Sequence, residues 1–457
     1  MTLSFPYLIS FLIGYFAINL IQGPHKILHR ALHCSLAIGI GLGISALLTF
    51  ISFLIFNQYH PTVIISLNII CLLSLIISNA FRFPQKNNPP SFLKSVITFF
   101  RPSHVIAWVI WGLLTYLIYF VAKIHPFGEW DAWALWNMKT KFLILSGHEW
   151  KALFSKLHWH TQPDYPLLLP FMNVWAYSIF GKNLQIVTST TAIILSVSCG
   201  LLLFSGLKQF IKKEFAFLVS LILFINSYFI YLATAQYADI LLAFYLLASI
   251  IVLPLMIREQ HRGMALLWGV LLGLMTFTKN EGIVLALLFA GITTLFLLLK
   301  NAGERKLNTK LLLFALLGIA MTSCFTIFFK FYLAPPNRDI LTNLVLTDMK
   351  FLNWSGLMII VNAFFDEISH RRWSFTWIFL IFLMGIRIPK LFYKECSVIS
   401  FFFIAYGLVL LLIYLTTVNF DLSWRLTNTL PRILFYLLPS ILFFGFYVNG
   451  RKKMILI

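Results

Sequence analysis

A polar loop at 124–166 carries several of the side chains that are suited to chemistry. Asp131 lies within the sequence Trp-Asp-Ala-Trp at 130–133, and Lys139 follows in the same loop. If 130–143 forms a helix, Asp131 lies on one face and Lys139 just over two turns further along. Tryptophan prefers the headgroup level of a membrane, and a carboxylate that reaches a hydroxyl group is a suitable general base. The pattern therefore predicts a base at the membrane surface. The alternative is an interfacial helix with a solvated carboxylate.

The same loop ends in a second polar group, Asp164 and Tyr165, directly before a proline. The Asp164 carboxylate is suited either to binding a cation or to capping the segment that follows, and the sequence leaves both interpretations open. His158 and His160 lie nearby, but their spacing supplies no third ligand for a metal ion. We therefore predict no metal site and no required cofactor, and a divalent cation is the one candidate.

Four further ionisable residues lie at the ends of apolar segments. Asp239 begins one segment, Lys279 and Glu281 follow another, and Arg432 precedes a third. An ionisable residue at membrane depth indicates function by default, and cations there suit a phosphate group. Each residue also has a simpler interpretation. Asp239 caps a helix, Lys279 extends to the surface, Glu281 is a first-turn acid and Arg432 lies among the headgroups.

The composition is that of an integral membrane protein. Of 457 residues, 60% are hydrophobic and 11% are charged, and the mean hydropathy is +0.88. Soluble domains carry about 25% charged residues, so a water-facing surface is excluded for most of this chain. No charged residue lies between Arg30 and Arg82. Because about 20 apolar residues cross a bilayer, this stretch holds two membrane spans.

The positive charge is concentrated in short connectors. The chain has 35 Lys and Arg against 15 Asp and Glu, and seven connectors hold 21 of the basic residues and four of the acidic ones. Basic connectors face the cytoplasm, and we expect them to contact anionic membrane lipids. No basic segment is interleaved with aromatic residues, so we predict no nucleic-acid partner. The connectors are 25–30, 81–101, 207–214, 258–262, 300–310, 387–395 and 451–453.

Fourteen apolar segments predict an all-α integral membrane fold, a polytopic bundle of about 12–14 spans in a single domain, 1–457. Alternation of the connectors places 124–166 and 334–373 outside, and it requires 167–206 to cross an odd number of times. We therefore expect 167–181 to be a short interfacial or re-entrant helix. In 334–373, we expect helices that lie in the interface plane. The segments are 4–22, 33–57, 62–80, 104–122, 167–181, 184–206, 215–235, 240–257, 264–278, 282–299, 311–333, 374–387, 397–418 and 433–449.

Four motifs, in this order, resemble a known family. They are Trp-Asp-Ala-Trp at 130–133, Asp-Tyr-Pro-Leu at 164–167, Tyr-Ala-Asp at 237–239 and a glycine-rich segment that ends in Lys-Asn-Glu-Gly at 279–282. Together they look like the GT-C glycosyltransferases, in the branch of the protein O-mannosyltransferases, lipid A aminoarabinose transferases and Rgt-type sugar transferases. The similarity covers about 120–300. Ala132 stands where relatives often have a second acid.

The resemblance implies a GT-C-like first large outer loop at 124–166 and an inverting glycosyltransferase. The enzyme would move a hexosyl or pentosyl group from a polyprenyl-phosphate donor to a glycolipid, polysaccharide or protein acceptor. It would act at the outer face of a bacterial cytoplasmic (inner) membrane. Asp131 would be the catalytic base. The expected substrate-binding residues are Lys139, Asp164, Tyr165, Asp239, Lys279, Glu281 and Arg432.

Two other classes of protein stay open. A lipid-linked-sugar flippase or transporter is one, although transporters often have internal repeats and this chain shows none. A polysaccharide polymerase or ligase is the other, and it would rely on arginine-rich outer loops. The pair Arg371 and Arg372 is the one such feature outside. Transfer or hydrolysis of a lipid-linked sugar by the purified protein separates these alternatives.

Overall fold

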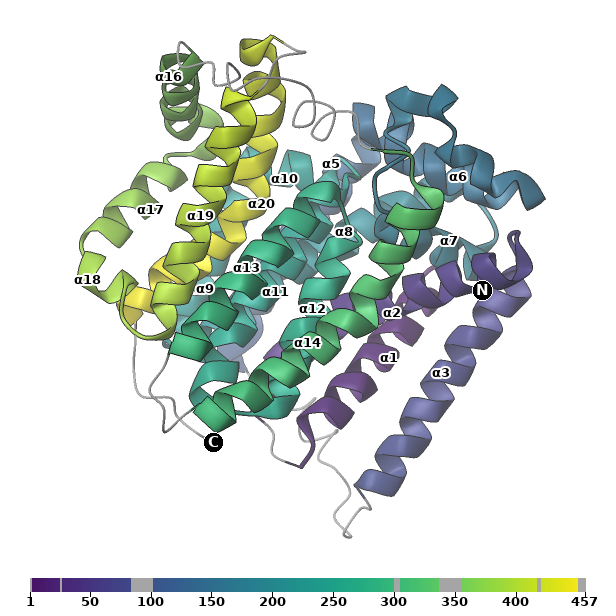
Figure 1. Ribbon diagram of the computed structural model, residues 1–457, viewed down its shortest axis with the longest axis horizontal. Helices are drawn as coiled ribbons and strands as arrows, with labels where there is room; N and C mark the ends of the chain where they lie inside the picture. The colour runs from purple at the N-terminus through teal and green to yellow at the C-terminus, as the bar shows by residue number, and fades with distance from the viewer. Residues whose placement is uncertain are drawn as a thin grey trace.

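A computed structural model describes residues 2–24, 27–83, 102–299, 305–336, 356–416 and 421–450. Within these ranges the chain forms helices and no strand, and most of the helices run side by side through one bundle (Figure 1). The predicted all-α polytopic membrane fold is confirmed. Most of the connector 81–101, the residues 300–304 and 451–453, and the part 337–355 of the second outer loop lie outside the described residues.

The helices follow the apolar segments of the sequence. Their bounds are α1 Phe5–Gln22, α2 Arg30–Phe56, α3 Pro61–Arg82, α5 Pro102–Ile124, η1 Ala132–Trp136, α6 Asn137–Leu145, η2 Gly147–Phe154, η3 Lys156–Thr161, α7 Leu168–Phe180, α8 Leu184–Leu207, α9 Lys213–Ile225, α10 Ser227–Thr234, α11 Ala238–Glu259, α12 Arg262–Thr276, α13 Asn280–Leu299, α14 Arg305–Phe328, η5 Phe329–Leu333, α16 Gly356–Ser369, η6 Arg371–Trp373, α17 Thr376–Gly385, α18 Ile388–Leu391, α19 Glu395–Leu415 and α20 Leu422–Gly450.

All fourteen predicted apolar segments are helical. In the described part of the chain, nine helices are long and apolar enough to cross a membrane, and a bent pair brings the number to ten. α5, α7, α12 and α17 account for the other segments. The segments were thus predicted correctly as helices; α7, α12 and α17, with 13, 15 and 10 residues, are shorter than the roughly 20 residues of a straight span.

α11 is the central helix of the bundle. It is apolar all round, and the 18-residue stretch that qualifies it as a span is completely buried. A helix that is hydrophobic on every side must be surrounded by other helices. α2, α8, α10, α12, α19 and α20 pack against it. Residues at the ends of α11 are therefore held on several sides.

Glycines bring α12 and α14 into close contact. A Cβ atom added at Gly269 would lie 2.1 Å from the Ala315 carbonyl oxygen, and one added at Gly273 would lie 2.0 Å from the Thr322 hydroxyl. The two glycines are four residues apart on one face of α12, the small-residue spacing that lets membrane helices approach. This packing fixes the end of α12, which leads directly into Lys279.

Two predicted segments differ from straight spans. Segment 215–235 is a pair of helices, α9 and α10, bent by 72°. The bend occurs because Asn226 leaves the helical conformation and its side chain accepts a hydrogen bond from the Phe229 N–H at 2.9 Å. α7, in the predicted short segment 167–181, has thirteen residues, and nearly all of them are buried. Protein therefore covers this short helix, as a partly inserted segment requires.

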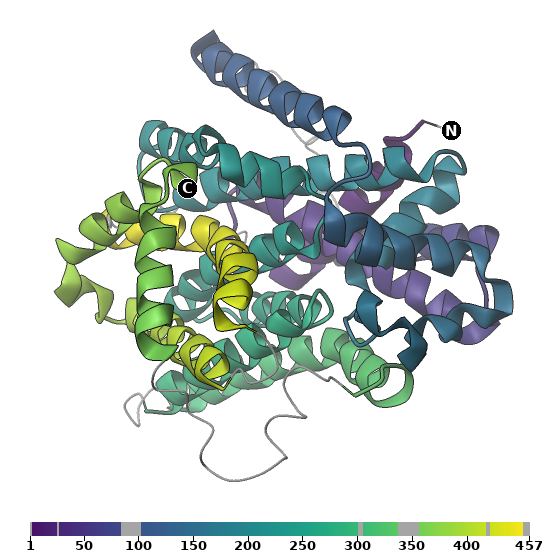
Figure 2. The same ribbon diagram turned by 90° about the horizontal axis from the view of Figure 1, so that it is seen from above.

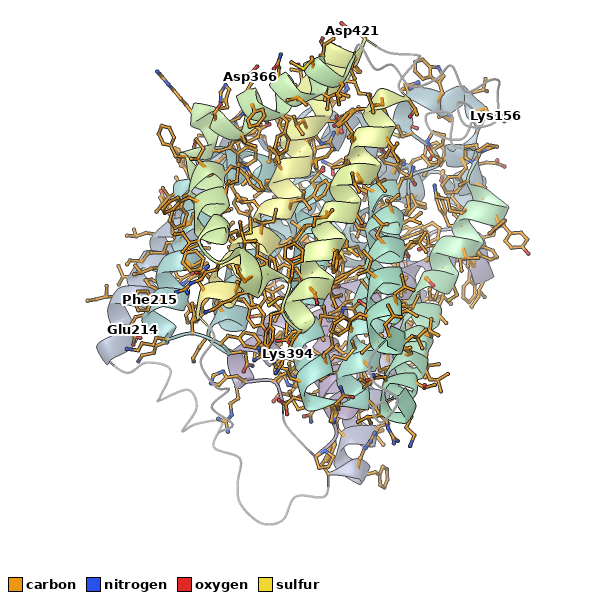
Figure 3. All side chains as sticks on the ribbon, turned by 60° about the vertical axis from the view of Figure 1, so that its left-hand side comes forward. Lys156, Glu214, Phe215, Asp366, Lys394 and Asp421 are labelled. Atoms are coloured by element: carbon orange, nitrogen blue, oxygen red, sulfur yellow. The ribbon has the colours of Figure 1, made fainter. Side chains whose placement is uncertain are left out.

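Residues from the predicted outer and cytoplasmic connectors lie at opposite ends of the bundle. Lys156 and Asp366 lie at one end, and Glu214 and Lys394 lie toward the other (Figure 3). These four residues belong to the loops 124–166, 334–373, 207–214 and 387–395, so the sides agree with the alternation expected from the charges. The end that carries Lys156 is called the loop end below. That the loop end faces outside stays a prediction.

Apolar side chains cover the outside of the bundle. α5 lies at the edge of the bundle (Figure 2), packed against α8 and α10. Its side chains Val109, Leu113 and Tyr116 are exposed. α16 lies across the loop end and exposes Met358 and Phe365 while it buries Glu367 (Figure 3). An apolar outer surface is suited to lipid tails, and the amphipathic α16 fits the interfacial helix expected in 334–373.

Candidate functional site

An arginine near the start of α20 joins two aspartates that are far away in the sequence. Nη1 of Arg432 donates a hydrogen bond to Oδ2 of Asp131 at 2.5 Å, and Nη2 donates to Oδ2 of Asp239 at 2.7 Å. Asp239 lies in the first turn of α11, while Asp131 directly precedes η1 in the loop 124–166. The guanidinium group thus connects the outer loop to the central helix.

A lysine extends this arrangement on the other side of Asp239. Lys279 Nζ lies 3.1 Å from Oδ1 of Asp239 and 3.1 Å from Oε1 of Glu281. The Lys279 side chain is buried, so it does not extend to the surface as its simpler interpretation required. The five side chains form one continuous ion-pair cluster, which we call the acid–base cluster; it consists of Asp131, Asp239, Lys279, Glu281 and Arg432.

Tyr237 forms one wall of the acid–base cluster. The guanidinium carbon of Arg432 lies 4.8 Å from the centre of its ring, a cation–π contact. The Tyr237 hydroxyl accepts a hydrogen bond from the Asp131 N–H at 3.3 Å. Burial raises the pKa of Tyr237 above its ordinary value. The hydroxyl therefore stays protonated, and Tyr237 orients Asp131 and Arg432 without adding charge.

Backbone contacts hold the outer loop against the start of α11. Gly128 has φ of +70°, and a Cβ atom there would lie 2.5 Å from the Ala235 carbonyl oxygen. The Glu129 N–H donates to that same oxygen. Gln236 has φ of +62°, and its side chain donates to the Pro126 carbonyl and accepts from Asn137 at 2.7 Å. These contacts fix the distance between Asp131 and Asp239.

The helix expected at 130–143 begins with a wider turn. Residues 132–136 form the π-helical turn η1, and α6 continues from there. π-helical turns inside α-helices often occur at functional sites. Trp130 and Trp133 are exposed, while Trp136 is buried. Two of the tryptophans thus suit the headgroup level, and the third holds the loop to the bundle.

A second group of polar residues lies beside the acid–base cluster. Asn280 donates to Oδ2 of Asp164 at 2.8 Å, and Lys330 donates to the Asp164 carbonyl and to Oδ1 of Asn280, each at 2.6 Å. Asn280 stands between Lys279 and Glu281 in the sequence, so this group shares a backbone segment with the cluster. It ties the end of the outer loop to α13 and η5, and we call it the Asp164 group.

Lys139 and Tyr165 belong with the Asp164 group. Lys139 is completely buried and donates to the Gln162 carbonyl at 2.7 Å. Its Nζ lies 5.6 Å from the Trp136 ring and 5.9 Å from the Tyr165 ring. Burial lowers its pKa from 10.5 to about 7; Asp164 opposes this shift and Lys330 adds to it. Lys139 therefore braces the loop from inside.

The structure divides the predicted site residues into two adjacent sets. Five meet in the acid–base cluster, and the other three, Lys139, Asp164 and Tyr165, lie in the Asp164 group. Asp239 makes ion pairs with its side chain, and the residue at the N-cap of α11 is Tyr237, so capping does not explain Asp239. Arg432 lies inside α20, which starts eleven residues before the segment expected at 433–449.

Sequence reasoning missed two groups of residues. Lys330 is an ionisable residue near the end of the apolar run 311–333, and this was a signal that could have found it. Asn280 and Gln236 are neutral amides in connectors, with no local pattern that marks them. Their importance comes from contacts with residues more than ninety positions away.

The acid–base cluster has a buried side and a partly exposed side. Asp239 is 1% exposed, whereas Asp131 and Arg432 are 25% and 24% exposed. In the described part of the chain, Nε of Arg432 and Oε2 of Glu281 are buried and have no hydrogen-bond partner. Buried polar groups are normally paired. The cluster therefore offers an anion a free N–H donor, and it offers a hydroxyl group a nearby carboxylate.

Within the described residues, no three or more His, Cys, Asp or Glu side chains are arranged to hold a metal ion. His158 and His160 have ring centroids 6.5 Å apart on η3. Asp164, the candidate for a cation, is engaged by Asn280 and Lys330. The oxygen atoms of Asp164 that would bind a metal ion are thus already in contact with the Lys330 ammonium group.

One comparison with known families gives a match. Residues 164–328, somewhat more than a third of the chain, match the model of the family described as dolichyl-phosphate-mannose-protein mannosyltransferase. The matched part contains Asp164, Asp239, Lys279 and Glu281; Asp131 and Arg432 lie on either side of it. The match confirms the resemblance to the GT-C-type membrane glycosyltransferases. No curated protein and no solved structure matches the chain significantly.

Proposed function

We propose that this protein is a membrane glycosyltransferase that moves a sugar from a polyprenyl-phosphate donor to an acceptor hydroxyl group. The acid–base cluster carries the proposal. It joins a partly exposed carboxylate to two cations at one end of an apolar bundle. The family match supports a membrane glycosyltransferase with a lipid-linked donor, and the family's name makes mannose the first sugar to test.

Asp131 is the proposed general base. In the transfer step, the acceptor oxygen forms a bond to the anomeric carbon while the bond from that carbon to the phosphate oxygen breaks. The hydroxyl proton passes to the Asp131 carboxylate, and the polyprenyl phosphate leaves with the bonding electrons. Attack opposite to the leaving group inverts the anomeric centre. A positioned base contributes about 10²–10⁴-fold to such a step.

The cations stabilise the phosphate. Negative charge develops on the leaving oxygen, and preorganised donors at that place lower the barrier. Arg432 presents a planar guanidinium group that suits phosphate oxygens, and Lys279 adds a second positive charge. Asp239 holds both cations, because it accepts from each of them. Glu281 pairs with Lys279, and the Asp164 group, with Lys139 and Tyr165, keeps the outer loop over the cluster.

The proposed setting is the outer face of a bacterial cytoplasmic membrane, with a glycolipid, polysaccharide or protein as the acceptor. The charge distribution supports the orientation. Lys156 and Asp366, from the loops 124–166 and 334–373, lie at the loop end (Figure 3), and Asp131 of the cluster belongs to the first of these loops. A flippase has no need of a carboxylate beside two phosphate-binding cations. A polymerase or ligase would use outer arginines, but the hydrogen bond of Arg372 to Glu367, and its place over the Tyr228 ring, support a structural role for Arg372.

Purified protein in lipid vesicles tests the function directly. With a polyprenyl-phosphate mannose that carries labelled sugar, we expect label to appear in an acceptor fraction or as free sugar, together with polyprenyl phosphate. The Asp131→Asn variant should lose this activity. Glu129→Gln is the matched control, because Glu129 lies in the same loop and is similarly exposed but pairs with His125. Movement of intact donor across the vesicle without cleavage would establish the flippase instead.

A further inference from the structure

Arg432 binds its two carboxylates unequally. Asp239 is almost completely buried on the central helix and also accepts from Lys279. Asp131 is one-quarter exposed and lies in the outer loop, where its carboxylate is held by Arg432 through Nη1. Water reaches the contact between Arg432 and Asp131 and screens it more than it screens the contact with Asp239. The bond between Arg432 and Asp239 is therefore the fixed one, and the bond to Asp131 is the exchangeable one.

Asp131 cannot use its whole carboxylate as a base while Arg432 holds it. The Oδ2 atom of its carboxylate already accepts a hydrogen bond from Arg432. The acid–base cluster also contains three acidic and two basic side chains. A phosphate placed beside it would meet a net negative charge unless one carboxylate moved away from the cations. Both difficulties disappear if the phosphate and Asp131 exchange places on Arg432.

We infer that the donor phosphate displaces Asp131 from Arg432, so that binding of the donor releases the carboxylate that then serves as the base. The inference rests on the proposed function and adds an order of events to it. Arg432 stays anchored to Asp239 throughout. Its Nε–H group, which is buried and has no partner in the described part of the chain, gives the phosphate a donor that Asp131 does not use.

The exchange has a consequence for substrate use. While Arg432 holds Asp131, the Oδ2 atom of the carboxylate is occupied by the guanidinium group and does not accept a proton from an acceptor hydroxyl group. After the phosphate has bound, the same carboxylate is free and close to the anomeric carbon. The donor therefore binds first, and the acceptor reacts only when the donor is in place.

Binding of farnesyl phosphate to the purified protein tests the exchange without depending on the identity of the sugar. The wild type must spend part of the binding free energy on breaking the contact between Arg432 and Asp131. In Asp131→Asn this ion pair is absent, so we expect the dissociation constant to fall about fivefold, in the range of a partly exposed ion pair. An Asp131→Asn variant that binds no more tightly than the wild type overturns the inference.

Two further variants distinguish the exchange from simple charge repulsion between the phosphate and the carboxylate. Glu129→Gln removes the same charge from the same loop, at a side chain 27% exposed, and should leave the dissociation constant unchanged. Equal gains in Asp131→Asn and Glu129→Gln would mean repulsion and not exchange. Asp239→Asn should weaken binding, because Arg432 loses its fixed partner. Tighter binding by this variant would also contradict the exchange.

A double-mutant cycle completes the test. In an Arg432→Met background, Asp131→Asn should no longer improve binding, since there is no guanidinium group to release. If Arg432→Met does not fold, the comparison of Asp131→Asn with Glu129→Gln decides alone. A wild type that neither binds farnesyl phosphate nor cleaves a polyprenyl-phosphate sugar removes the proposed function itself. A wild type that does both, without tighter binding in Asp131→Asn, removes only the exchange.

Discussion

Replacing Lys139 by methionine measures how strongly burial of the Lys139 amine in the outer loop affects the free energy of unfolding. In the folded protein the Lys139 pKa is about 7, mainly because the side chain is completely buried. In the unfolded chain it is near the ordinary value of 10.5. Between these two pH values the unfolded chain binds one proton more than the folded protein. The contribution of Lys139 to the free energy of unfolding therefore rises with pH in this window, and this contribution is constant below about pH 7.

The magnitude follows from the two pKa values. One pKa unit corresponds to about 1.4 kcal/mol. Because the amine of the folded protein is half-protonated at pH 7, stability should rise by roughly 2 kcal/mol between pH 7 and pH 9. The total over the whole window is on the order of 5 kcal/mol. Lys139→Met removes this slope. It also removes the hydrogen bond to the Gln162 carbonyl, a loss of about 1 kcal/mol that does not depend on pH.

Thermal unfolding in detergent, followed by tryptophan fluorescence from pH 6 to pH 9, provides the measurement. The stability of the wild type relative to Lys139→Met should increase with pH above 7 and stay constant below it. Lys156→Met is the matched control, because Lys156 is exposed in the same loop (Figure 3) and should give curves parallel to the wild type. If Lys139→Met also gave curves parallel to the wild type, the conclusion that the Lys139 amine is buried and largely neutral would be refuted.

Three other predictions concern activity and orientation. Asp131→Asn should lower the rate of transfer about 10²–10⁴-fold while the protein stays folded and inserted; near-native turnover would make Asp131 structural. Lys279→Met should raise the KM for the donor more than that for the acceptor, and equal increases would speak against phosphate recognition by Lys279. An impermeant thiol reagent added to intact cells should label a single cysteine in place of Ser155 but not one in place of Glu214. The reverse labelling pattern would invert the proposed orientation.

Hydrophobicity made the helices predictable. Each of the fourteen apolar segments is a helix because a stretch of some twenty apolar residues has few other ways to satisfy its backbone in a membrane. The bend at Asn226 was not foreseen, since a single polar residue in an apolar run usually stays helical. α20 was expected to be shorter, because the polar residues before Arg432 resemble a connector.

The residue types of the site could be predicted, but their pairing could not. Asp239 and Arg432 were singled out as ionisable residues at the ends of apolar segments, and Asp131 as the acid of the Trp-Asp-Ala-Trp sequence in the polar loop. The hydrogen bond between Arg432 and Asp131 joins positions 301 residues apart, and no local pattern encodes such a contact. Lys139 shows a second limit of the sequence. Its position in the loop made it an expected substrate-binding residue, but no local pattern indicated that it is completely buried beside Trp136 and Tyr165.

The central position of α11 also bears on how the protein is made. Ribosomes deliver the chain from the N-terminus, so α11 enters the membrane before α12, α19 and α20, which later surround it. During that interval Asp239 is a carboxylate without its final partners. Lys279 follows after 40 residues and Arg432 only after 193. A chain that stops before α20 therefore keeps Asp239 and Asp131 without the guanidinium group that joins them. α20 thus completes the acid–base cluster after its four other members have been synthesised.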